Sequence, residues 1–319
     1  DLLFSTIVAT WENGREEIEG LLKHINTKGE RFNFSNEFLM RCCLVLSDSP
    51  VLYKVNSFKS ENVQKIKDEW KDISSAVSQM VDLLVEFGFS SNTLTSHNAT
   101  IIIAYYIMKG GEINKDIKRD IKKYLIHALL NGIYGSTQEQ VIAALRNAFR
   151  EEKLINGQKT YELKVKKFVF NDLLLIKLPS RKTLYVRDVD IENFLTYKLS
   201  ASSFLVLSLL YPNLKYSEVQ FHQDHIHPHS GFTKEKLKKM NIQEEDWQTW
   251  FLYRDLIPNI QLLEGRQNES KNATEFKKWF EKKSKDEQGQ FCISNYIPLD
   301  VDYDFSSFMQ FFEKRKSLL

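Results

Sequence analysis

Apolar residues recur at helical spacing through the first half of the chain. Between 61 and 88 they fall every third or fourth position, at Val63, Ile66, Trp70, Ile73, Val77, Met80, Leu84 and Phe87. Residues spaced in this way lie on one stripe of an α-helix. The pattern predicts one long helix that buries this stripe, with Ser60 as its N-cap and Gly88 at its end.

Residues typical of helix ends predict further helices. Ser35 is placed to cap a helix over 35–46, and Ser96 opens another that stops at Gly110. Ser136 and Glu139 have the spacing of a capping box at the start of a helix over 136–152. Amphipathic patterns add helices over 15–26 and 114–135.

The pattern of residue types changes after position 152. From 153 to 187, β-branched and aromatic residues alternate with turn signals, which indicates a linking region of mixed structure. A short helix over 188–199 and a buried helix ending before Pro212 follow. We therefore expect an α+β, mainly α-helical protein. Its helical domain covers 1–155 and a second domain covers 156–319, beginning with a connecting segment over 156–200.

Composition narrows the class of protein. The 319 residues carry a net charge of +2, which is too mild to indicate nucleic-acid binding without a local site. The three cysteines form no CxxC pair, as is typical of reduced thiols. The apolar run over 100–108 is far shorter than the roughly 20 residues of a membrane span. We expect a soluble, cytoplasmic protein without membrane contact.

Because the chain begins inside a helical pattern without methionine, we also expect that an upstream part has been removed.

Four of the seven histidines lie in FHQDHIHPHS, at 221–230. A structural zinc site needs four nitrogen or sulfur ligands, but the cysteines are remote and neither HExxH nor CxxC is present. A chance surface cluster would leave the Asp-His-Ile-x-Pro run unexplained. Phosphodiester cleavage explains it better, since Asp224 can bind Mg²⁺ through oxygen and His225 can serve as the base that activates water.

A site of this kind needs a second protein ligand, normally on a following helix. The segment NIQLL at 259–263 has the pattern of a short strand, and EGRQNESK at 264–271 leads into a helix that carries Asn268. Strand, strand and helix is the order of a ββα-metal finger. The sequence between His225 and Asn259 is long, and we expect two helices within it.

DHIHP followed by PNIQLL and RQNESK resembles the HNH nuclease motif. The resemblance implies that His225 is the general base, that Asp224 and Asn268 bind the metal, and that Asn259 organises the loop between the strands. It also implies that Lys271 faces a phosphate. His222, two residues before Asp224 on the same strand face, is a further candidate metal ligand, with a supporting hydrogen bond as the alternative.

Nearly the whole chain is similar to the C-terminal part of GmrSD-type, modification-dependent restriction proteins, including their helical domain. That similarity implies a DNA endonuclease, expected to nick, that uses Mg²⁺ or Mn²⁺ and acts in restriction or antiviral defence. Its expected partners are DNA, including modified or phage DNA, a second copy of the chain, and a missing N-terminal nucleotide-binding domain. The family's Asp-Gly-Gln-Gln-Arg run does not occur here, so we expect no NTPase activity.

Some assignments stay open at this stage. Arg266 is a candidate contact to DNA phosphate, with a solvated side chain as the alternative. His227 and His229 flank Pro228 beyond the strand, and we expect both to be exposed to solvent or DNA. A DNA-binding or regulatory module with a silent nuclease site is the alternative function.

Overall fold

The computed structural model describes residues 2–155 and 157–319 of the chain. It contains two compact units, Asp1–Val186 and Arg187–Leu319. As expected, the protein is mainly helical with small two-stranded sheets. The division falls inside the expected connecting segment, later than the expected boundary at 155, because residues up to 184 are bonded to the first unit. His127 Nδ1 lies 2.9 Å from the carbonyl oxygen of Leu184, and the Tyr106 hydroxyl donates to the Lys166 carbonyl.

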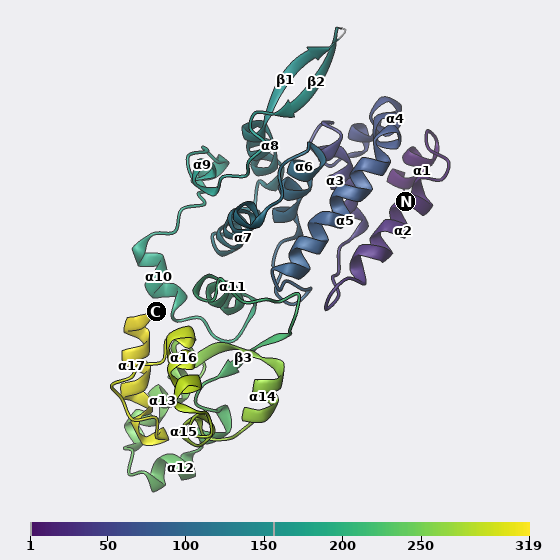
Figure 1. Cartoon of the computed structure of the whole chain (residues 1–319). Helices are drawn as coiled ribbons and strands as arrows, with labels where there is room; N and C mark the ends of the chain where they lie inside the picture. Colours follow the sequence, from purple (N-terminus) through teal and green to yellow (C-terminus); the bar gives the residue numbers. More distant parts are fainter. Residues whose placement is uncertain (1, 156) are drawn as a thin grey trace. The chain divides into compact units, whose positions relative to one another are not determined.

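The first unit is built from helices around one buried helix (Figure 1). This helix is α6 (Ile101–Met108), of which the six residues Ile101–Tyr106 are buried, and it contacts α3 (Asn36–Leu46), α5 (Trp70–Glu86) and α8 (Gln138–Phe149). A helix that is apolar on all sides is stable only when other elements surround it. The α-helices of the unit are α1 Leu2–Val8, α2 Gly14–Asn26, α3 Asn36–Leu46, α4 Ser60–Asp68, α5 Trp70–Glu86, α6 Ile101–Met108, α7 Lys115–Leu130, α8 Gln138–Phe149 and α9 Phe170–Leu173.

The long helix expected between Ser60 and Gly88 is in fact two helices. α4 and α5 meet at Glu69, whose amide closes α4 and whose carbonyl accepts the first hydrogen bonds of α5. The break lets Trp70 stack edge-on against Trp11, with ring centroids 5.1 Å apart, and donate to Glu17. The apolar stripe itself is buried as expected, except for Trp70, which is half-buried.

Two capping expectations had different outcomes. Ser35 accepts a hydrogen bond from the Phe38 amide, which confirms it as the N-cap of α3. The capping box of Ser136 and Glu139 is wrong, since α8 begins at Gln138. The Glu139 carboxylate instead accepts hydrogen bonds from Arg41 and from the Tyr53 amide. These long-range partners of Glu139 take the place of the expected capping contact at the start of its own helix.

The region of mixed structure contains an antiparallel hairpin, β1 Arg150–Ile155 and β2 Gln158–Leu163. It extends away from the helices of its own unit (Figure 1).

The second unit places one short sheet among small helices. β3 Phe221–His225 pairs antiparallel with β4 Ile260–Glu264, and the expected two helices, α12 Lys234–Lys239 and α13 Trp247–Tyr253, lie between them in sequence. The other α-helices are α10 Asp188–Phe194, α11 Ala201–Leu210, α14 Gly265–Lys271, α15 Phe276–Phe280, α16 Lys285–Asn295 and α17 Phe308–Leu318. Aromatic side chains from α15, α16 and α17 dominate one hydrophobic cluster of the unit, and a second cluster gathers Phe232, Trp250, Phe305, Phe308 and Phe312.

Among the described residues, no helix combines the length and the hydropathy required to cross a bilayer.

Candidate active site

The strand, strand, helix order expected around FHQDHIHPHS is present in the second unit. In the β3–β4 register Asp224 lies opposite Gln261, and His225 lies opposite Ile260. α14 follows β4 directly and contacts both strands. The last residues of β3 and the side chains of α14 therefore share one small region of the unit.

Asp224 is held by two partners. Its Oδ2 lies 2.9 Å from Nζ of Lys271 and accepts a hydrogen bond of 3.0 Å from Nε2 of Gln261. The Lys271 ammonium also donates to the carbonyl oxygen of His225, at 2.5 Å. Burial lowers the pKa of Lys271, while the Asp224 carboxylate opposes that shift.

The expected phosphate contact of Lys271 is not compatible with this position. Its side chain is 0% exposed, and its ammonium is directed to Asp224 and the strand backbone. The residue is one turn after Asn268 as expected, but that turn faces the sheet rather than the surface. Arg266, on the first turn of the same helix, is exposed.

His225 is held by a carboxylate that sequence reasoning did not single out. Its Nε2 lies 3.1 Å from Oδ1 of Asp255, and Asp255 is gripped by Arg254 through Nε–Oδ1 at 3.0 Å and Nη2–Oδ2 at 2.7 Å. Burial lowers the pKa of His225, partly offset by Asp255 and Asp224. The imidazole is therefore neutral near pH 7, as a base must be.

Asn259 joins the two segments that flank this histidine. Its side chain is fully buried; Oδ1 accepts from the His227 amide at 2.9 Å, and Nδ2 donates to the carbonyl oxygens of His227 and Arg254 at 3.1 and 2.7 Å. These three hydrogen bonds satisfy most of the donor and acceptor capacity of a side-chain amide. They fit the role of a loop organiser.

His227 is not exposed, contrary to the expectation for it. Its side chain is 1% exposed and its ring lies 4.8 Å from Phe311 and 5.6 Å from Phe276, measured between centroids. Burial lowers its pKa to about 3. The reason is that the chain turns inward after β3, where Asn259 fixes the His227 backbone. His229 is exposed as expected, with its ring 5.7 Å from that of His225.

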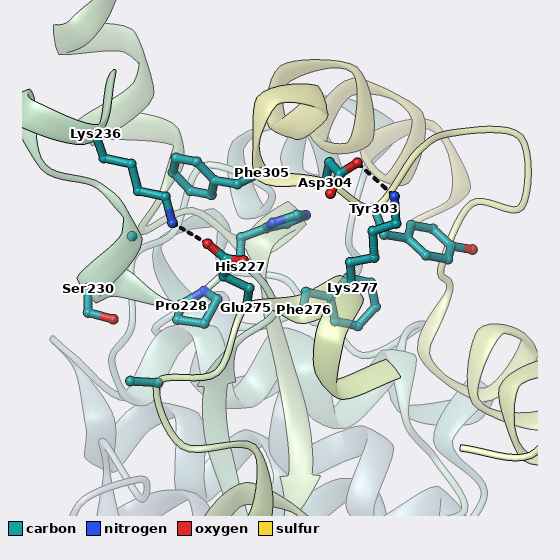
Figure 2. Close-up of a pocket in the computed structure, with 12 residues that line it drawn as sticks. His227, Pro228, Ser230, Lys236, Glu275, Phe276, Lys277, Tyr303, Asp304 and Phe305 are labelled. Carbon is teal, nitrogen blue, oxygen red and sulfur yellow. Dashed lines mark hydrogen bonds and ion pairs between the residues drawn. The ribbon is translucent and has the colours of Figure 1, made fainter. Parts of the chain in front are cut away.

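His227 also lines a cavity of about 250 Å³ (Figure 2). In Figure 2 its imidazole lies between two ion pairs, Lys236–Glu275 and Lys277–Asp304. Its Nε2 has no hydrogen-bond partner among the described residues.

His222 and Asn268 lie on the same scaffold without being tied to Asp224. His222 is two residues before Asp224 on β3, and a Cβ placed on Gly265 would lie 3.6 Å from its Nε2, so the imidazole packs beside the start of α14. Asn268 is half-buried on α14. Within the described part of the chain, no hydrogen bond connects either side chain to Asp224.

A divalent ion would find few protein ligands near Asp224. Among residues 2–155 and 157–319, no group of three or more His, Cys, Asp or Glu side chains could hold a metal. Near Asp224, however, the buried Oε1 of Gln261 has no partner among those residues, and both bonds to Asp224 fall on Oδ2. Mg²⁺ is commonly held by one or two carboxylates and water. Asp224 would supply one such carboxylate, and the Lys271 ammonium 2.9 Å from it would weaken the binding of a cation.

Comparison with protein-family models gives no match to this chain, and comparison with curated proteins gives none either.

Sequence reasoning missed three contributors, Arg254, Asp255 and Gln261. Gln261 could have been found, because antiparallel pairing of NIQLL with FHQDH in the observed register places it opposite Asp224. Arg254 and Asp255 follow α13, in the long insertion, and nothing in their local pattern indicates the return of the chain to His225.

Proposed function

We propose that the second unit is an HNH-type, ββα-metal endonuclease domain that hydrolyses phosphodiester bonds in DNA. The observation that carries the proposal is the Asp224–His225 pair at the end of β3, in a two-stranded sheet that contacts the helix bearing Asn268. The similarity of its motifs to GmrSD-type proteins supports a role in restriction or antiviral defence. The expected product of one site is a nick, because one site cuts one strand.

In this mechanism His225 takes a proton from the attacking water. Its neutral imidazole accepts that proton, and Asn259 keeps the loop beyond it fixed. Asp224 and Asn268 would hold Mg²⁺ or Mn²⁺, which supplies positive charge near the scissile phosphate and the leaving oxygen. Arg266, exposed on the same helix as Asn268, would contact a neighbouring phosphate.

One observation favours a second candidate, a DNA-binding or regulatory module with a silent nuclease site. The Lys271 ammonium occupies the Asp224 carboxylate, so it would compete with a bound cation. Both candidates predict DNA binding, but only the nuclease predicts a metal-dependent product.

Conversion of supercoiled plasmid to nicked circles, with Mg²⁺, with Mn²⁺ and with chelator, separates the two. We expect nicking that requires the metal, and its loss in His225→Ala with DNA binding retained. His229→Ala is the matched control, since His229 is an exposed histidine of the same segment. Equal cutting by His225→Ala and the parent protein would show that His225 is not the base. Modified and unmodified plasmid tested in parallel would reveal a dependence on modification.

A further inference from the structure

The contact between His225 and Asp255 brings together residues 30 positions apart in sequence. The side chains are 17% and 24% exposed, so both are largely shielded from water. Arg254 fixes the carboxylate through two N–H donors, one to each oxygen. Forked pairing of this kind restricts both the position and the rotation of a carboxylate. Asp255 is therefore a fixed acceptor that faces one nitrogen of the imidazole.

This arrangement determines which imidazole nitrogen carries hydrogen. An ionised carboxylate can only accept hydrogen bonds, and a neutral imidazole has one N–H donor and one acceptor nitrogen. Nε2 faces the Asp255 oxygen, so Nε2 must carry the hydrogen. The lone pair of the neutral ring then lies on Nδ1. A base that holds its lone pair on the wrong nitrogen cannot take a proton from water in the required direction.

We propose that Asp255 is the positioning residue of the site: it selects the Nε2–H tautomer of His225 and leaves Nδ1 as the proton acceptor. The inference rests on the proposed nuclease function for its consequence but not for the tautomer itself. As Nδ1 takes a proton from water, the ring becomes an imidazolium. Its Nε2–H stays on the ring and continues to donate a hydrogen bond to Asp255. The carboxylate then faces a positive charge, which it stabilises without accepting the proton.

The tautomer can be measured without any enzyme assay. In protein labelled with ¹⁵N-histidine, the shifts of the two ring nitrogens distinguish N–H from bare nitrogen, and the His225→Gln spectrum assigns the His225 signals. At about pH 8, above the ordinary histidine pKa, we expect Nε2–H and bare Nδ1 for His225. We expect Asp255→Asn, and separately Asp255→Ala, to lose this preference. At that pH, a hydrogen on Nδ1 of His225 in the parent protein would overturn the proposal, because Nδ1 would then not be available as the proton acceptor.

Asp190→Asn is the matched control. Asp190 lies in the same unit and is gripped by Arg187 through two similar bonds of 3.0 and 2.8 Å, but it has no recorded contact with His225 among the described residues. The His225 signals should be unchanged in this variant. If they change as much as in Asp255→Asn, loss of any such ion pair disturbs the ring, and the assignment to Asp255 fails.

Cleavage kinetics provide the functional arm. We expect Asp255→Asn to lower kcat roughly 10- to 100-fold, a part of what general-base catalysis supplies, with KM for plasmid changed less than about 2-fold. Asp255→Glu should recover part of that loss. Unchanged kcat in Asp255→Asn, in protein that cuts DNA, would contradict the positioning role. If the parent protein does not cut, the nuclease proposal fails, and the tautomer measurement still decides the inference about Asp255.

Discussion

The Lys271 ammonium lies 2.9 Å from the Asp224 carboxylate, and the lysine side chain is fully buried. The same ammonium donates to the backbone carbonyl of His225, so one cation joins α14 to both residues at the end of β3. A buried charge that has lost its partner is far more costly than an exposed one. This pair therefore contributes both to the stability of the second unit and to the electrostatics of its candidate site.

Lys271→Met should destabilise the protein, because it leaves Asp224 without its ammonium partner in a mostly buried position. We expect the free energy of unfolding to fall by about 2–4 kcal/mol, measured by urea denaturation followed by tryptophan fluorescence. Adding Asp224→Asn should recover part of the loss. Lys278→Met, at a mostly exposed ion pair with Glu275, is the control and should have little effect. Wild-type stability of Lys271→Met would argue against a charged pair.

Asn259→Ala should loosen the segment that follows β3. The substitution leaves the His227 amide and the carbonyl oxygens of His227 and Arg254 without their partner in a buried setting. We expect a loss of about 2–4 kcal/mol in the free energy of unfolding and faster amide hydrogen exchange at His227. Asn193→Ala, on α10, serves as the control. Retained exchange protection at His227 in Asn259→Ala would mean that other contacts hold the loop.

His227 should make the protein sensitive to acid. Burial lowers its pKa from 6.5 to about 3, so between these values the unfolded chain binds a proton that the native ring does not. Stability should therefore fall as the pH drops from 6.5 toward 3, by on the order of 5 kcal/mol. The buried ring also faces the charges of Lys271 and Lys236, which disfavour its protonation.

Denaturation of His227→Phe over the same pH range tests this. The variant should lose much of the slope, while the part that comes from carboxylates remains; Glu275, whose pKa is lowered to about 2 by Lys236 and Lys278, is one of these. His229→Phe is the control, since that side chain is exposed. An unchanged slope in His227→Phe would show that His227 is not the group responsible.

Arg315 should be among the most sensitive positions of the second unit. Its guanidinium is fully buried and donates to the carbonyl oxygens of Ile257, Pro258, Ile260 and Asn295 and to the Tyr211 hydroxyl. Arg315→Lys cannot reproduce this set, because a single ammonium lacks the planar fork of five donors. We expect a loss of at least about 2 kcal/mol in urea denaturation.

Arg315→Met should cost more than Arg315→Lys, since it removes all of these hydrogen bonds at once. Lys316→Met, on an exposed side chain 3.5 Å from Glu192, is the control and should be close to neutral. Equal stability of Arg315→Met and the parent protein would contradict the role of Arg315 in fixing the start of β4.

The sequence by itself determined most of the local structure. Spacing of apolar residues located the buried stripe between Val63 and Phe87, and a serine before FLMRCCLVL located the start of α3. NIQLL was expected as a strand, FHQDH as its companion, and EGRQNESK as the turn into the helix that carries Asn268, and all three are present. These features depend on residues a few positions apart in the chain, so the order of residues along the sequence is enough to predict them.

Tertiary structure decided the partners of the charged and polar groups. Glu139 bonds to Arg41 and Tyr53 rather than to its own helix end, and Lys271 turns to Asp224 rather than to solvent. Asp255 reaches His225 only because the chain returns after α13, and His227 is buried because Asn259 draws its backbone inward. A polar side chain can satisfy its hydrogen bonds with any donor or acceptor that the fold brings near. Its partner is therefore set by long-range packing, which no local pattern records.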